Sequence, residues 1–125
     1  MGGRVKLLYR CAVPRWLSKQ ATSSLGLLDY GDNEIFVKNR TFSFFGMNMA
    51  FRKSQKRFRE DLGVKKGNFF ISGGEDTQFV LEHLESGNRV LYQPKAVVYH
   101  KVEESRLNKS YLRKWFFNYA QANII

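Results

Sequence analysis

The sequence predicts an α/β fold in which helices flank a mixed sheet. Residues 3–9 alternate loosely between apolar and polar side chains, which is typical of a strand. An apolar-periodic segment with helical spacing opens at Glu75 and carries Val80, Leu81 and Leu84 on one face. Two strand-like runs and a second helical segment follow it. This order of strand, loop, helix, strand, strand and helix favours a mixed sheet with helical cover.

The other segments are assigned from their turn residues and apolar runs. In chain order we expect irregular chain over 10–40, then one or two buried strands over 41–52 interrupted at Gly46. A basic loop over 53–72, with room for a helical turn at 54–60, follows them. The chain then continues with strands over 89–93 and 96–101, separated by Pro94 and Lys95, and a closing helix over 105–122. A glycine inside a strand-like run marks a bulge or a close approach of the backbone to a ligand. Gly87 is expected to end the first helix.

The amino-acid composition narrows the class of protein to which the chain can belong. A hydrophobic fraction of 43% and a charged fraction of 26% indicate a globular domain rather than a disordered chain. The net charge of +10 points to polyanionic partners, which include nucleic acid, phosphorylated substrates and an anionic membrane surface. The single cysteine, Cys11, rules out an internal disulfide and fits a reducing compartment, so we expect a cytoplasmic protein.

The segment Ser72-Gly73-Gly74-Glu75-Asp76 carries the strongest functional signal and allows two interpretations. In a capping box, Ser72 and Glu75 would satisfy each other's backbone N–H groups, a stabilisation of about 1 kcal/mol. That interpretation leaves Asp76 and the two glycines unexplained. Alternatively, a carboxylate at a helix N-terminus stays ionised beside the free N–H groups and can serve as a general base. The residues alone favour neither interpretation over the other.

The histidines and the closing helix supply further candidates. His100 ends an apolar strand, where it could ligate a metal or be satisfied by hydrogen bonds, whereas His83 is expected to be structural. Arg106, Lys109 and Arg113 recur at helical spacing on one predicted face. That face could contact a diphosphate, rest on an anionic membrane, or simply be solvated.

Four segments together resemble the family 2 glycosyltransferases, which have the GT-A fold. They are Gly2 to Val5, Phe45 to Arg52, Gly73 to Phe79, and Val97 to His100 with the residues through Arg113 behind it. Their order and spacing are similar to those of the acceptor-side, C-terminal half of such enzymes. The resemblance implies inverting transfer of a sugar from a nucleotide-sugar donor to an acceptor hydroxyl, in a single displacement.

The resemblance also implies roles for individual residues. Asp76 corresponds to the catalytic base, and Glu75 either positions the acceptor or caps the helix, with capping favoured. The other implied contacts are Gly46, Asn48 and Gly74 to the sugar or acceptor, Arg106 and Arg113 to the diphosphate, and His100 to a divalent metal, Mn²⁺ or Mg²⁺. The expected donor is a UDP- or GDP-sugar, and the expected acceptor is a saccharide or a lipid-linked saccharide, reached by peripheral contact with the inner face of the membrane.

The chain lacks one motif that is typical of this family. The family's nucleotide-binding half ends in an Asp-x-Asp motif that holds the metal, and no Asp-x-Asp occurs in this chain. We therefore expect residues 1–125 to form a single partial domain that is inactive alone and needs the metal only in the complete enzyme. Two alternatives stay open, a non-catalytic interaction protein and a basic module that stacks nucleic acid on aromatic residues near Trp115. We expect no nucleic-acid partner, because the carboxylate pair would repel phosphate.

Overall fold

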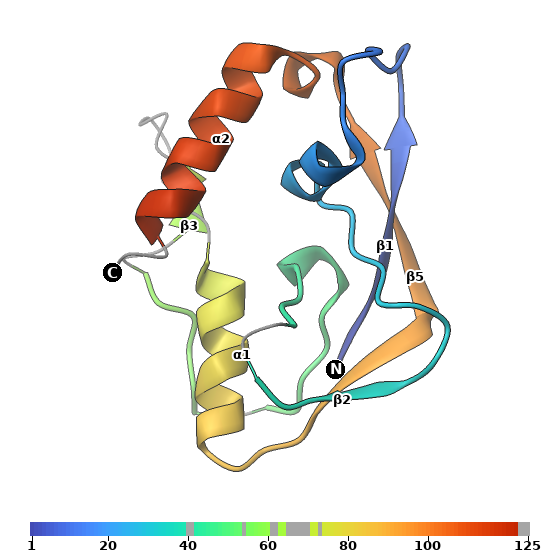
Figure 1. The fold of residues 1–125 in the computed structure, drawn as a ribbon. Coiled ribbons are helices and arrows are strands. Elements are labelled where there is room, and N and C mark those ends of the chain that lie inside the picture. The colour runs from blue at the N-terminus through green and yellow to red at the C-terminus, as the bar shows by residue number, and fades with distance from the viewer. Residues whose placement is uncertain (40–41, 54, 61–62, 65–70, 73, 123–125) are drawn as a thin grey trace.

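A computed structural model describes residues 1–39, 42–53, 55–60, 63–64, 71–72 and 74–122 of the chain (Figure 1). Its main sheet has the strand order β1 (Gly2–Tyr9), β5 (Val90–Val102), β2 (Ile35–Val37). Because β1 runs parallel to β5 and β2 runs antiparallel to it, the sheet is mixed. The expected α/β class with a mixed sheet is confirmed.

The remaining elements are helices and one short hairpin. The hairpin pairs β3 (Gly63–Val64) with β4 (Ile71–Ser72). The helices are α1 (Glu75–Glu85), α2 (Lys109–Ala122) and the 3₁₀ turns η1 (Lys19–Leu25), η2 (Gly46–Asn48) and η3 (Glu104–Arg106). All of them lie to one side of the long β1–β5 pair in Figure 1, with α2 above α1.

The strand β5 corrects the expectation of two short strands. It runs unbroken for 13 residues through Pro94, and its register against β1 jumps from Gly3–Gln93 to Arg4–Val97. Proline lacks a backbone N–H, so it is tolerated in a strand mainly at such irregularities. Gly3 is required here, because a Cβ at this position would lie 2.3 Å from the carbonyl oxygen of Ala96.

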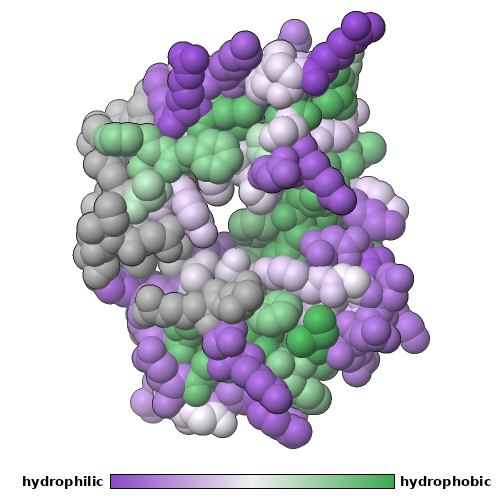
Figure 2. All heavy atoms as spheres, in the orientation of Figure 1, coloured by the Kyte–Doolittle hydropathy of each residue, from purple (hydrophilic) through white to green (hydrophobic). Residues whose placement is uncertain are grey.

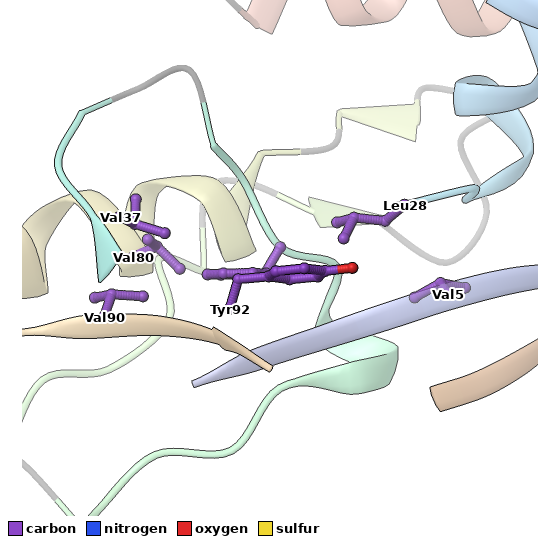
Figure 3. Packing of buried hydrophobic residues seen from close by; sticks show 7 residues of the cluster. Val5, Leu28, Val37, Val80, Val90 and Tyr92 are labelled. Atoms are coloured by element: carbon purple, nitrogen blue, oxygen red, sulfur yellow. The ribbon is translucent and has the colours of Figure 1, made fainter. Parts of the chain in front are cut away.

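Two buried clusters lie along this strand pair. The first joins both main strands to β2 and α1 and consists of Val5, Leu28, Val37, Phe44, Val80, Val90 and Tyr92 (Figure 3). The second lies under η1 and α2 and consists of Leu25, Val102, Leu107 and Leu112. Val80 and Leu81 are buried as the helical periodicity predicted, and Leu84 packs against the first cluster.

The expected strands over 41–52 are wrong. Instead, η2 begins at Gly46, where Asn48 N–H donates to the carbonyl of Phe45 at 2.9 Å, and an isolated bridge joins Met49 to Gly2. Tertiary hydrogen bonds hold the turn: the Gly46 N–H donates to the Asp76 carboxylate, and the Asn48 amide donates to the carbonyls of both main strands. The part of the basic loop at residues 61–62 and 65–70 lies outside the described residues.

The end of α1 follows the prediction closely. Gly87 has a φ of +78°, the left-handed conformation that favours glycine. Its N–H donates to the carbonyl of Leu84 at 2.9 Å, and the N–H of Asn88 donates to that of His83 at 3.0 Å. These two bonds form a Schellman motif, which satisfies the last carbonyls of the helix.

An arginine network that no sequence pattern indicated fastens the loop after η1 to the sheet. The side chain of Arg4 is only 14% exposed; its Nε lies 3.1 Å from Asp29 and its Nη2 lies 2.6 Å from Asp32. Arg4 also donates to the Gly31 carbonyl at 2.7 Å and contacts the hydroxyl of Tyr92. The sequence showed Asp29 and Asp32 only as turn residues, because their partner lies 25 or more positions away.

We expect the Arg4→Met variant to unfold at a lower temperature, with the largest loss at neutral pH. The hydrogen bond from Arg4 lowers the pKa of Asp32 below its ordinary value of 3.8. A lowered folded-state pKa adds stability above that ordinary value, and the contribution disappears as the pH falls through the folded pKa. Thermal unfolding at about pH 7 and about pH 2.5 checks this. An equal loss at both values would contradict the ionic explanation.

We expect the Tyr92→Phe variant to lose about 1–2 kcal/mol of unfolding free energy. Tyr92 is fully buried, and its hydroxyl accepts from the Tyr30 N–H at 3.3 Å while contacting Arg4 and the Gly31 carbonyl. Denaturant unfolding measures the loss. The matched control is Tyr99→Phe on the same strand, whose ring is 60% exposed and which we expect to change stability by less than about 0.5 kcal/mol.

Candidate functional site

The N-terminus of α1 is built on a glycine, which corrects the capping-box interpretation. Gly74 is the N-cap residue, with a φ of +112° that residues other than glycine rarely adopt, and the N-cap position therefore supplies no side-chain hydrogen bond. Its carbonyl accepts from Gln78 N–H at 2.8 Å. Glu75 is therefore the first helical residue and not the third, as a capping box requires. The favoured capping role of Glu75 is wrong.

The carboxylate of Asp76 instead accepts hydrogen bonds from backbone N–H groups. Its Oδ1 accepts from Thr77 N–H at 2.8 Å, and its Oδ2 accepts from Gly46 N–H at 3.1 Å. The half-buried carboxylate thus joins the start of α1 to the start of η2, across 30 residues of sequence. Each ionised oxygen has a further lone pair, so the group can still accept a proton from a hydroxyl.

Glu75 lies beside it with one carboxylate oxygen unsatisfied. The Oε2 atom is buried and has no hydrogen-bond partner among the described residues. A buried polar atom without a partner is costly, by roughly 1–3 kcal/mol. A donor from a bound molecule, such as an acceptor hydroxyl, would relieve this cost.

Gly46 and Asn48 play different parts in η2. A Cβ on Gly46 would meet nothing within 4 Å, so open space adjoins the backbone that holds Asp76. The amide nitrogen of Asn48 donates to the carbonyls of Arg4 at 2.8 Å and Ala96 at 3.0 Å, which uses both of its N–H bonds. Asn48 therefore closes the irregularity between β1 and β5, and only its Oδ1 is left for a ligand.

His100 is oriented by a backbone carbonyl. Its Nδ1 lies 2.8 Å from the oxygen of Leu25, and because a carbonyl only accepts, Nδ1 carries the proton. The other nitrogen, Nε2, then offers a lone pair, the usual arrangement of a metal-binding histidine. A Cβ on Gly26, whose φ is +94°, would lie 2.9 Å from Nδ1, so glycine is needed beside this ring.

The turn η2 connects most of these candidates. Gly46 binds Asp76, and Asn48 binds the two main strands. Met47 and His100 both lie within 3.5 Å of the position that a Gly26 Cβ would take. Through Gly46 and Asn48, this segment therefore meets two of the other three segments that carry the family resemblance, at Asp76 and at Arg4. In Figure 2 the surface opens as a gap between the part formed by α2 and the part formed by α1, and the N-terminal end of α1 points toward it in Figure 1.

The cations of the closing segment are arranged differently from the prediction. Arg106 lies in η3 and not in α2, so only Lys109 and Arg113 share a helix, and the expected common face is wrong. The Arg106 guanidinium lies 6.0 Å from the centre of the Tyr111 ring, and Arg113 is exposed. Among the described residues, neither arginine contacts Asp76, and their diphosphate role stays a prediction.

No group of three or more His, Cys, Asp or Glu side chains is placed to hold a metal ion in the described part of the chain. None of the helices described here has the length and apolar character needed to cross a bilayer.

Comparisons with protein-family models, with curated proteins and with solved structures find no match for this chain.

We expect Asn48→Asp to destabilise the fold more than Asn48→Ala. The carboxylate would place an acceptor against two carbonyl oxygens, whereas alanine only removes the bonds, at a cost of about 1–3 kcal/mol. Thermal unfolding of both variants measures the order. If Asn48 served only a ligand, both variants would unfold like the parent protein, and that outcome would contradict the closing role.

Proposed function

We propose that the chain forms the acceptor side of an inverting glycosyltransferase of the family 2 type. The observation that carries the proposal is the carboxylate of Asp76, held by two backbone N–H groups at the meeting point of α1 and η2. A general base must be rigidly placed and still able to accept a proton, and this carboxylate meets both conditions. The hydrogen bonds that join η2 to Asp76 and to both main strands support the same conclusion.

In the proposed reaction, Asp76 removes the proton from the acceptor hydroxyl as its oxygen attacks the anomeric carbon of the donor sugar. The bond to the nucleoside diphosphate breaks in the same step, so the configuration inverts. Positive charge develops on the sugar in the transition state, and the nearby carboxylate stabilises it. Glu75, with its unsatisfied oxygen, is the proposed contact to the acceptor.

A divalent cation, Mn²⁺ or Mg²⁺, would neutralise charge on the departing diphosphate. His100 fits the role of one ligand, because the bond from its Nδ1 to the Leu25 carbonyl orients the ring and leaves Nε2 as the nitrogen that would hold the metal. One histidine does not make a complete metal site, and no Asp-x-Asp motif adds to it in these 125 residues. The proposal therefore needs further ligands from a nucleotide-binding half and from the diphosphate.

The expected partners are a UDP- or GDP-sugar and a saccharide acceptor, which in the lipid-linked case would be met at a membrane surface. The exposed face of α2 supports peripheral contact. Phe116, Phe117 and Tyr119 are 44%, 61% and 55% exposed, and Lys109 and Arg113 lie on the same helix. Aromatic and basic side chains together suit an anionic bilayer interface.

We expect Asp76→Asn to lower turnover by about 10²–10⁴-fold in an enzyme that contains this chain with a donor-binding half. Donor affinity should change by less than about threefold, a shift under 1 kcal/mol, because the base contacts the acceptor rather than the donor. Release of nucleoside diphosphate from a panel of nucleotide sugars measures turnover, and calorimetry measures donor binding.

The matched control is Glu85→Gln, which removes a carboxylate from the exposed, opposite end of the same helix and should leave turnover unchanged. Full turnover by the Asp76→Asn variant would refute Asp76 as the base. Failure of the complete enzyme to release nucleoside diphosphate from any donor would refute the proposed function itself.

A further inference from the structure

A second hollow lies at the other end of α1 from Asp76. Its volume is about 860 Å³, and it is bounded by residues 50–53 and 55–56 on one side and by His83, Asn88 and Arg89 on the other. His83 follows Asp76 by seven residues, so roughly 10 Å of helix axis separates the two sites. Hollows of this size accept small molecules, for which pockets of about 300–1,000 Å³ are usual.

Four cationic residues contribute to the lining of this hollow, namely Arg52, Lys53, Lys56 and Arg89. None of the described residues that line it is an aspartate or a glutamate. Among the described residues, Arg52, Lys53 and Arg89 form no ion pair. Like charges gathered around one concavity raise its positive potential and attract anions. An anion bound there would relieve their mutual repulsion.

Two contacts hold in place the side of the hollow that is formed by the end of α1 and the residues just before β5. The guanidinium of Arg89 lies 5.4 Å from the centre of the Phe36 ring, a cation–π contact that orients it. The ring of His83 packs edge-on against Phe79, with centroids 4.7 Å apart, and its Nδ1 lies 3.3 Å from the amide nitrogen of Asn88. An amide nitrogen donates, so Nδ1 accepts and the proton is on Nε2, which is buried and has no hydrogen-bond partner in the part of the chain that the structure describes.

We propose that this hollow is a binding site for a small molecule that carries phosphate. Arginine and lysine are the side chains that bind phosphate, and arginine does so in a bidentate fashion. A hollow of this volume suits a compact ligand rather than a nucleic-acid strand. This inference does not rest on glycosyl transfer, and the site shares none of the residues proposed for the reaction.

Inorganic pyrophosphate titrated into the full chain at low ionic strength tests the inference, with amide shifts followed by NMR. The largest shifts are expected at residues 52, 53, 83 and 89. Arg89→Gln and Lys53→Gln should each weaken the affinity about tenfold, which corresponds to the loss of one charge-assisted contact. Both side chains are exposed, so the variants should keep the parent spectrum.

The charge-matched control is Lys101→Gln, an exposed lysine on β5 that does not line the hollow. It should bind pyrophosphate like the parent protein. An equal loss of affinity in this control would show attraction by net charge alone and would overturn the inference. Absence of binding would overturn it too, as would shifts confined to Arg106 and Arg113, which would instead support the diphosphate contacts of the proposed reaction.

Discussion

The parallel pairing of β1 with β5 is the constraint on which the rest of the structure depends. It joins the two ends of the chain over the full length of β1, and β5 also carries β2 on its other edge. Val5 and Tyr92 contribute to one buried cluster, and Val102 contributes to the other. The irregularity at Pro94 interrupts this pair, and the amide of Asn48 closes it from outside the sheet. The turn η2, which contains Asn48, also binds Asp76 through Gly46. The position of the candidate site therefore depends on the strand pair.

The helix α1 separates two kinds of chemistry along one axis. Its N-terminal end carries Glu75 and Asp76, where the helix dipole favours negative charge. Its C-terminal end lies beside His83 and Arg89, where the dipole favours cations. The charges of Glu75 and Asp76 therefore agree with the dipole at the N-terminal end, whereas at the other end Glu82 and Glu85 lie on the helix close to the cation Arg89.

Local patterns predicted the parts of the fold that depend on local physics. The strand β1, the helix α1 with its buried Val80 and Leu81, and the glycine that ends it all follow from periodicity and turn residues. The continuity of β5 did not follow, because Pro94 indicates a break and the compensating Asn48 lies 46 residues earlier. The Arg4 network escaped prediction for the same reason. Asp76 was identified from its place at a helix start, but its bond to Gly46 depends on tertiary packing that no spacing reveals.

The distance in sequence between β1 and β5 has a consequence for synthesis of the protein. The last residue of β1 is Tyr9 and the first of β5 is Val90, so β1 leaves the ribosome long before its partner exists. At usual elongation rates the delay is about 4–16 seconds. During that interval the apolar positions of β1 and its unpaired backbone edge are open to association with other nascent chains. A chaperone that binds short extended segments would have its natural target in these first residues.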